Sequence, residues 1–173
     1  MRIYLEDVSL ARERELLEGV RKSRSFHRPW MAPPSTPERF RSFVKAAHSN
    51  TRRTFFVLDA KRQLVGVITV SEIVRGFFQS AYLSYFALAP HHGSGQMSAG
   101  LCAVLKLAFG ELRLHRVEAN IQPSNTRSIA LVRRAGFTLE GYSKRYLKIG
   151  GRWRDHERWA LTKEAFRPKR SKR

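Results

Sequence analysis

The segment from Tyr82 to Ala108 constrains the fold most, because it predicts a strand, a glycine turn and a helix in immediate succession. An apolar, aromatic-rich run ends at Pro90, and a turn with Gly93 and Gly95 follows it. One helix face is predicted by the spacing of Met97, Leu101, Val104, Leu105 and Ala108. A helix start presents unpartnered backbone N–H groups, and glycines let a phosphate approach them. The segment predicts a pyrophosphate cradle, although an ordinary turn has the same pattern and neither the dinucleotide fingerprint nor a Walker P-loop is present.

Hydrophobic periodicity along the rest of the chain predicts helices and strands without an internal repeat. We expect helices to start at Ser9 and at Thr36, and a further helix to run from an Asn125 cap to Gly136. The dipeptide Gly150-Gly151 predicts a hairpin turn. The predicted strands cover residues 3–5, 55–58, 64–74, 82–90, 115–122, 138–149 and 152–161. This order implies a mixed sheet flanked by helices, of α/β or α+β type.

Composition favours one domain with an anionic partner. The chain has 173 residues, enough for one core, and a formal net charge of +19. That charge favours phosphates, RNA, a ribosome surface or an acidic protein, but it equally suits a surface that only keeps the protein soluble. We expect one domain over residues 1–166 and a basic, solvated tail over residues 167–173.

Cysteine content and the N-terminal segment predict a cytoplasmic location. Cys102 is the single cysteine, so an internal disulfide is excluded. The N-terminal residues carry charges where a signal peptide needs an apolar core. No apolar run approaches the roughly 20 residues that span a bilayer, so no membrane partner is expected.

Three stretches together resemble one enzyme family: ALAPHHGSGQMSAGL, LHRVEANIQPSNTRSIALVRRAGFTLEGY and GGRWRDHERWAL. The chain resembles the GNAT acyl-CoA N-acetyltransferases, and among them the RimJ/RimL-type ribosomal-protein-alanine N-acetyltransferases. The resemblance covers nearly the whole chain. It implies a single GNAT domain, with a mixed, mostly antiparallel sheet of about seven strands flanked by four helices. It also implies acetyl-CoA as co-substrate, no metal, and direct transfer of the acetyl group to an amine.

By resemblance, acetyl-CoA is held at the glycine turn, at the preceding strand and at the start of the helix after Asn125. The family has Gln or Arg at the first position of the turn motif, where this chain has Pro90. The departure is small, since backbone N–H groups form most of the cradle. The implied cofactor-binding residues are Phe86, Ala87, Leu88, His92, Gly93, Ser94, Gly95, Gln96, Asn125 and Ser128.

The departing thiolate needs a hydrogen-bond donor or an acid. Many relatives use a tyrosine at a position that is Val132 here, so that acid is missing. The resemblance to the RimJ/RimL branch implies that Ser128 takes this role, although a serine in a first helical turn often bonds a backbone carbonyl instead. Cys102 suggests a covalent route, which we disfavour because it lies beside an apolar helix face.

The general base is less defined by the sequence. The family often has a glutamate on the strand before the turn, where this chain has Ser84 and Tyr85. Of the remaining glutamates we favour Glu118, on a predicted central strand, over Glu72 and Glu140, although a solvated surface carboxylate is the commoner role. A protein N-terminus has a pKa near 8, so a water chain is a sufficient alternative.

The acceptor groove is expected between the proline-rich loop at residues 26–31 and the final hairpin. Its expected substrate-binding residues are Trp30, Met31 and Tyr85, whereas Trp153 and Trp159 are expected in the core or packed on the sheet.

Three functions fit the sequence. They are acetylation of the N-terminal amine of a ribosomal or other protein, acetylation of a small amine such as a polyamine or an antibiotic, and RNA or ribosome binding without catalysis on a GNAT fold. The strong positive charge disfavours cationic small amines. The glycine turn and Asn125 disfavour a protein without catalysis. We expect a monomer or a homodimer.

Overall fold

The protein was analysed as a computed structural model, which describes residues 2–28 and 30–167. A short 3-10 helix, η1 (Leu10–Arg12), leads into the first of five α-helices. The helices are α1 (Glu13–Lys22), α2 (Arg24–His27), α3 (Pro37–Lys45), α4 (Gln96–Phe109) and α5 (Thr126–Ala135). The strands are β1 (Tyr4–Asp7), β2 (His48–Ser49), β3 (Arg52–Leu58), β4 (Leu64–Val74), β5 (Ser80–Ala87), β6 (Arg116–Ile121), β7 (Thr138–Ile149) and β8 (Arg152–Thr162).

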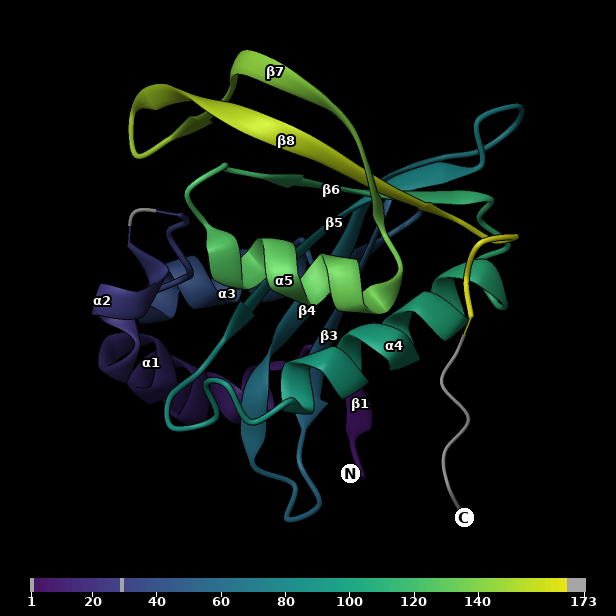
Figure 1. Ribbon diagram of the computed structural model, residues 1–173. Helices are drawn as coiled ribbons and strands as arrows, with labels where there is room; N and C mark the ends of the chain where they lie inside the picture. Colours follow the sequence, from purple (N-terminus) through teal and green to yellow (C-terminus); the bar gives the residue numbers. More distant parts are fainter. Residues whose placement is uncertain (1, 29, 168–173) are drawn as a thin grey trace.

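The strands form one mixed sheet in the order β1-β3-β4-β5-β6-β8-β7, with β2 paired to β3 (Figure 1). Neighbouring strands are antiparallel except β5 and β6, which are parallel and connected through α4. A parallel pair needs a crossover connection, and the predicted strand–turn–helix segment supplies it. The GNAT-type mixed sheet expected from the sequence is confirmed.

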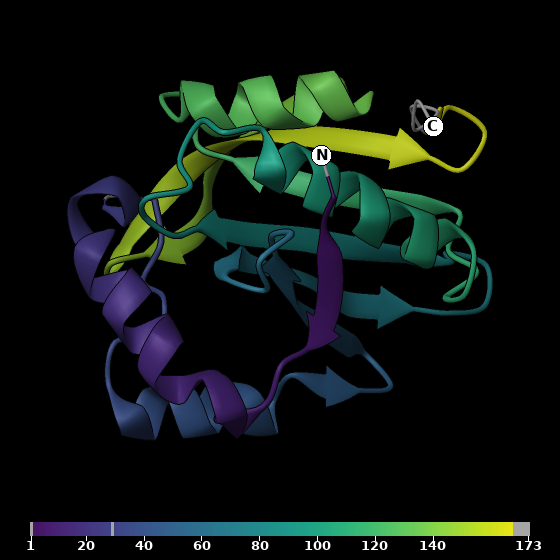
Figure 2. The same cartoon turned by 90° about the horizontal axis from the view of Figure 1, so that it is seen from below.

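Helices cover both faces of the sheet (Figure 2). On one face α4 and α5 pack over a core that includes Leu101, Val104 and Val132. On the other face α1 and α3 cover a second core that includes Leu16 and Phe40. Most of β3 and of β4 is therefore buried on both faces, which explains the nearly continuous hydrophobic run of β4.

Local signals placed most elements correctly. Asn125 caps α5, since its Oδ1 accepts a hydrogen bond from the Ser128 backbone N–H at 3.2 Å. Gly136 ends that helix with φ of 95°, a left-handed conformation that suits glycine. Gly150 and Gly151 also have positive φ and form the β7–β8 turn.

Three expectations were wrong in detail. Ser9 precedes η1 but makes no side-chain capping bond, and α1 begins only at Glu13. The proline-rich loop contains α2, whose four residues are too few to show a helical period. Trp153 is 60% exposed and is not a packing residue, whereas Trp159 is buried as expected.

Two expectations concern the tail and the membrane. Apart from Arg167, the basic tail lies outside the described residues. Across residues 2–28 and 30–167, no helix combines the length and the apolarity that crossing a membrane requires.

Candidate active site

The candidate site lies where β5 and β6 part. The two strands pair from Ser80 and Arg116 only as far as Tyr82 and Glu118, and beyond these residues they have no shared register. The second half of β5 therefore has an edge that faces a gap in the sheet. Two cavities adjoin this region, one between α2 and α5 and the other over strands β4 and β5.

The glycine turn after β5 forms a cradle of backbone donors. Gly93 and Gly95 have φ of 75° and 81°, and open space surrounds the position of a Cβ at Gly93. The Ser94 Oγ lies 2.8 Å from Gln96 Oε1 and 2.7 Å from the His91 carbonyl oxygen, and its single hydrogen bonds one of these two acceptors, which holds the turn against the start of α4. Within the described residues, the backbone N–H groups of His92, Gly93 and Gly95 donate to no protein acceptor. These groups suit an anionic ligand such as a diphosphate.

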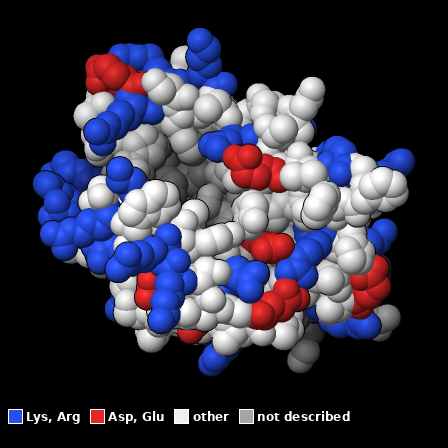
Figure 3. Space-filling model, turned by 90° about the horizontal axis from the view of Figure 1, so that it is seen from above, with Lys and Arg blue, Asp and Glu red and all other residues white. Residues whose placement is uncertain are grey.

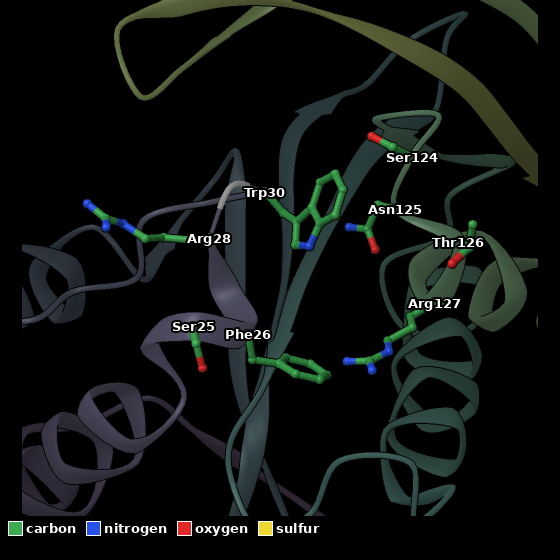
Figure 4. A pocket seen from close by; sticks show the side chains of 8 residues that line it. All are labelled: Ser25, Phe26, Arg28, Trp30, Ser124, Asn125, Thr126 and Arg127. Carbon is green, nitrogen blue, oxygen red and sulfur yellow. The ribbon is translucent and has the colours of Figure 1, made fainter.

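The larger cavity, about 270 Å³, separates α2 from the N-terminus of α5. Figure 4 shows Phe26 and Arg127 pointing toward one another from opposite walls, with Trp30 across from Asn125. The Phe26 ring stacks on His92 of the glycine turn with centroids 3.6 Å apart, and the Arg127 guanidinium lies 4.6 Å from the same ring. Phe26 thus contacts both the glycine turn and α5.

The smaller cavity, about 160 Å³, lies on the opposite face of the sheet, next to Tyr85. Its floor is formed by β3, β4 and β5, and residues before and within α3 form its cover. The lining residues are Met31, Ala32, Pro33, Pro34, Phe43, Arg52, Val67, Thr69, Ser71, Ser84, Tyr85 and Phe86. Arg52 is the one charged residue in this lining, all of which lies within the described residues.

Tyr85 connects the two cavities. It lines the smaller one, and its hydroxyl lies 2.5 Å from the Ser128 Oγ, in the first turn of α5 beside the larger one. Burial raises the pKa of Tyr85 to about 12, although the hydrogen bond with Ser128 acts in the opposite direction. The phenol is therefore protonated at neutral pH, and either hydroxyl of the pair can donate to the other.

Glu118 lies at the point where β5 and β6 separate. Its Oε1 accepts a hydrogen bond from Arg116 Nε at 2.8 Å, and the same arginine binds Glu140. The hydrogen bond from Arg116 lowers the pKa of Glu140 below its ordinary value. Glu118, Arg116 and Glu140 therefore form one ionic cluster. The hydrogen bond from Arg116 Nε uses only the Oε1 atom of Glu118.

Histidines buried around the turn are held neutral. Burial lowers the pKa of His27 and that of His92, and His27 Nε2 lies 2.8 Å from the Ala87 carbonyl oxygen. The neutral His27 ring donates through Nε2 to that oxygen, which fixes α2 against the end of β5. Positive charge near the site therefore comes from arginines and lysines rather than from these rings.

Lysine and arginine side chains gather beside a hollow on the face seen in Figure 3, mainly on the side that carries α1 to α3. Exposed basic residues on α1 and α2 include Arg21, Lys22 and Arg24. This charge favours an approaching anionic partner.

Comparison with known proteins identifies the family. The Acetyltransferase (GNAT) domain family matches residues 2–138. The chain belongs to the GNAT acetyltransferase family. GNAT enzymes take the acetyl group from acetyl-CoA, and the glycine turn offers free amide donors that fit its diphosphate.

Two related proteins and one solved structure show which members of the family this chain is similar to. The [ribosomal protein uS5]-alanine N-acetyltransferase of Escherichia coli is 33% identical over 164 residues, 90% of this chain and 84% of that protein. The structure of Mycobacterium smegmatis RimJ in complex with CoA-disulfide superposes with a TM-score of 0.87 at 26% identity, covering 94% of this chain and 82% of that one. The spermidine N(1)-acetyltransferase of Vibrio cholerae is 25% identical over 152 residues, 87% of each chain. The chain is thus similar to the RimJ-type enzymes named by the resemblance.

The structure brings the predicted residues to two sides of one gap. The residues expected at the cofactor line β5, the glycine turn and the start of α5, while Met31 and Tyr85 line the smaller cavity and Trp30 the larger one. Sequence reasoning missed Arg52, and it placed Phe26 in the loop of the expected acceptor groove, whereas Phe26 lines the larger cavity. Nothing in the sequence distinguishes Arg52 from the other lysines and arginines, of which the chain has 33 in total. The strand that carries it was also expected to start only at residue 55, whereas it starts at Arg52.

Proposed function

We propose that this GNAT enzyme acetylates the N-terminal amine of a protein, with a ribosomal protein as the favoured kind of acceptor. The observation that carries the proposal is the lining of the smaller cavity, which has one arginine and no carboxylate. The similarity to the uS5-alanine N-acetyltransferase over 90% of the chain supports it independently.

A polyamine is a poor fit to that lining. Two or more ammonium groups need carboxylates or carbonyls to replace their hydration, and a neighbouring arginine repels them. A peptide N-terminus carries one amine followed by polar backbone groups, which the hydroxyls of Thr69, Ser71 and Ser84 can bind. The cavity holds about five waters at roughly 30 Å³ each, so a small first residue fits best.

We propose that the side of the gap formed by the glycine turn holds acetyl-CoA. The free amides of His92, Gly93 and Gly95 would bind its diphosphate, and backbone groups of β5 together with Asn125 would orient its arm. When bound, acetyl-CoA supplies the acetyl group as a thioester. The residues of the chain then have to place the amine, remove its proton and stabilise the negative charge on sulfur.

Ser128 is proposed as the donor to that sulfur, with Tyr85 as the residue that positions it. The two oxygens lie 2.5 Å apart. In the proposed arrangement the Tyr85 phenol donates to Ser128 Oγ, which leaves the Ser128 hydrogen free to point into the gap. Full proton transfer from Tyr85 is disfavoured, because its pKa of about 12 exceeds that of a thiol, near 8.5. The difference corresponds to about 5 kcal/mol. The pair therefore acts through hydrogen bonding, and the thiolate leaves as an anion.

Glu118 is proposed as the proton acceptor for the amine. One of its oxygens accepts from Arg116, and the other is available to a proton delivered through water. A protein N-terminus needs little help, since with a pKa near 8 about one tenth of it is already neutral at pH 7. The effect of replacing Glu118 should therefore shrink as the pH rises toward 8.

The proposal is tested by turnover of acetyl-CoA, read as thiol release, with three sets of acceptors. These are peptides with free N-terminal alanine or serine, the same peptides with a blocked N-terminus but an internal lysine, and spermidine or spermine. Free N-termini should give the highest kcat/KM. A higher kcat/KM for the polyamines, or equal turnover of blocked peptides, would contradict the proposal.

Acetylation of a small amine stays the second candidate, because the spermidine enzyme of Vibrio cholerae matches 87% of the chain. The arginine in the acceptor cavity and the charge of +19 count against it. A docking contact with RNA or the ribosome, a cytoplasmic location and a monomeric or homodimeric state stay predictions.

A further inference from the structure

Side chains of the smaller cavity stand in rows across the sheet. Arg52 on β3 lies opposite Ser71 on β4, which lies opposite Tyr82 on β5. In the adjacent row Thr69 pairs with Ser84. Residues in register point to the same face of a sheet, so these polar side chains share the face that α1 and α3 cover further along.

The charge of Arg52 has no counterpart among the described residues. Its guanidinium takes part in none of the ion pairs or side-chain hydrogen bonds found there. Glu72 follows Ser71 on β4 and is the nearest carboxylate by strand spacing, but no ion pair among the described residues joins it to Arg52. Along the row itself the first carboxylate is Glu118, and three strand spacings of about 4.8 Å place its backbone about 14 Å away. Arg116 already binds that carboxylate. A half-buried arginine in a concave, hydroxyl-lined site suits an anion that arrives with the substrate.

The position of Arg52 fits an acceptor that lies extended across the cavity. From Ser84, beside the Tyr85–Ser128 pair, Arg52 is two strands across and two residues along, which is about 12 Å between backbones. An extended peptide advances about 3.3 Å per residue, so this distance corresponds to three or four residues. The side chains of arginine and acceptor shorten the gap. The Arg52 guanidinium can therefore contact the second to fourth residue of an acceptor whose amine lies at the gap between β5 and β6.

We propose that Arg52 is a specificity-determining residue that binds an Asp or Glu side chain at the second to fourth position of the acceptor. The inference rests on the proposed function and narrows it to proteins with an acidic N-terminal segment. Arg52 binds the carboxylate, orients the chain along the cavity and excludes acceptors with a lysine at that place. The basic side chains on one side of the hollow attract the same acidic segment from a distance (Figure 3).

The test uses eight-residue peptides with N-terminal alanine that differ at one position only, as Glu, Gln or Lys, with the variable residue placed second, third or fourth. The parent enzyme should prefer Glu to Gln by about tenfold in kcat/KM at the best position, with Lys lowest, as expected for a partly exposed ion pair. Arg52→Gln should remove the preference, and Arg52→Glu should reverse it in favour of Lys. The preference should also weaken as salt is added.

A matched control is available next to the test residue. Arg53 follows Arg52 on β3 but belongs to the opposite face, where its guanidinium lies 5.9 Å from the Phe55 ring. Arg53→Gln should keep the parental ratio of Glu to Gln to Lys, even if it lowers stability, because a ratio between peptides does not depend on the folded fraction.

The outcomes separate the role of Arg52 from the proposed acetylation of protein N-termini. Peptide turnover without dependence on the variable residue, or an unchanged preference in Arg52→Gln, overturns the role of Arg52 and leaves N-terminal acetylation standing. A parental preference for Lys has the same consequence. Turnover of spermidine without turnover of any peptide overturns the proposed function, and the role of Arg52 with it.

Discussion

Replacement of Tyr85 by phenylalanine tests the proposed donor pair most directly. The change removes one oxygen and leaves the ring that packs against the core. It breaks a hydrogen bond of 2.5 Å to Ser128, whose hydroxyl is then free to bond a carbonyl of its own helix. The phenol titrates near pH 12, so its loss should leave the pH profile of kcat between pH 7 and 9 unchanged.

The expected losses of kcat and of stability in Tyr85→Phe follow from the hydrogen bond that the change removes. Loss of a donor to a developing oxyanion costs a factor of about 10² to 10³ in kcat, and a diffuse sulfur anion should lose less. Because Tyr85 acts through Ser128, we expect kcat to fall about tenfold, or about 1.4 kcal/mol, with the KM for acetyl-CoA unchanged. One lost hydrogen bond should cost about 1 kcal/mol of stability. For a domain of this size that lowers Tm by about 2–4 °C.

A double-mutant cycle with Ser128→Ala separates catalysis from packing. The measurement is thiol release at saturating acetyl-CoA, under conditions where chemistry limits the rate. If the two hydroxyls act as one unit, the double variant should be no slower than Ser128→Ala alone. Tyr142→Phe is the matched control, since that hydroxyl makes a 2.5 Å hydrogen bond to Asp155 on the exposed β7–β8 hairpin. An undiminished kcat in Tyr85→Phe, or losses that multiply in the double variant, would show that Tyr85 does not act through Ser128.

Three further predictions concern the cofactor cradle, the cysteine and acid stability. Gly93→Glu should abolish measurable binding of acetyl-CoA in calorimetry, whereas Gly76→Glu, at a site with the same positive φ and open surroundings, should bind as the parent does. Cys102→Ala should keep kcat within about twofold, since Cys102 is a half-buried residue of α4, and a large loss with intact folding would support a covalent route. Burial lowers the pKa of His27 below its unfolded value of 6.5, so its contribution to stability is present above about pH 6.5 and is lost as the pH falls. The urea midpoint should therefore drop between pH 7.5 and 5.5, and His27→Gln should reduce that drop; an equal drop in both proteins would show that His27 is not its source.

Sequence patterns were most informative where one residue decides a local conformation. The glycine turn, the Asn125 cap and the Gly150-Gly151 hairpin were all predicted, because left-handed φ values and orphan helix donors need these residue types at these places. Helical periodicity located the buried face of α4, because burial repeats with the turn of the helix. The nearly continuous apolar run located β4, because both faces of that strand are buried over most of its length. The four-residue α2 and the two-residue β2 left no such signal, as neither is long enough to repeat.

The sequence alone thus predicted the order of the longer elements, the glycine turn before α4 and the family to which the chain belongs. Which side chains meet at the gap depends on the tertiary fold and was not predicted from the sequence. Tyr85 and Ser128 are 43 positions apart, and Arg52 of β3 lines the same cavity as Tyr85 of β5. These contacts depend on the register of strands distant along the chain and on the early separation of β5 from β6. A local pattern records which face a side chain occupies, but the neighbour across the sheet is chosen by the packing of the whole fold.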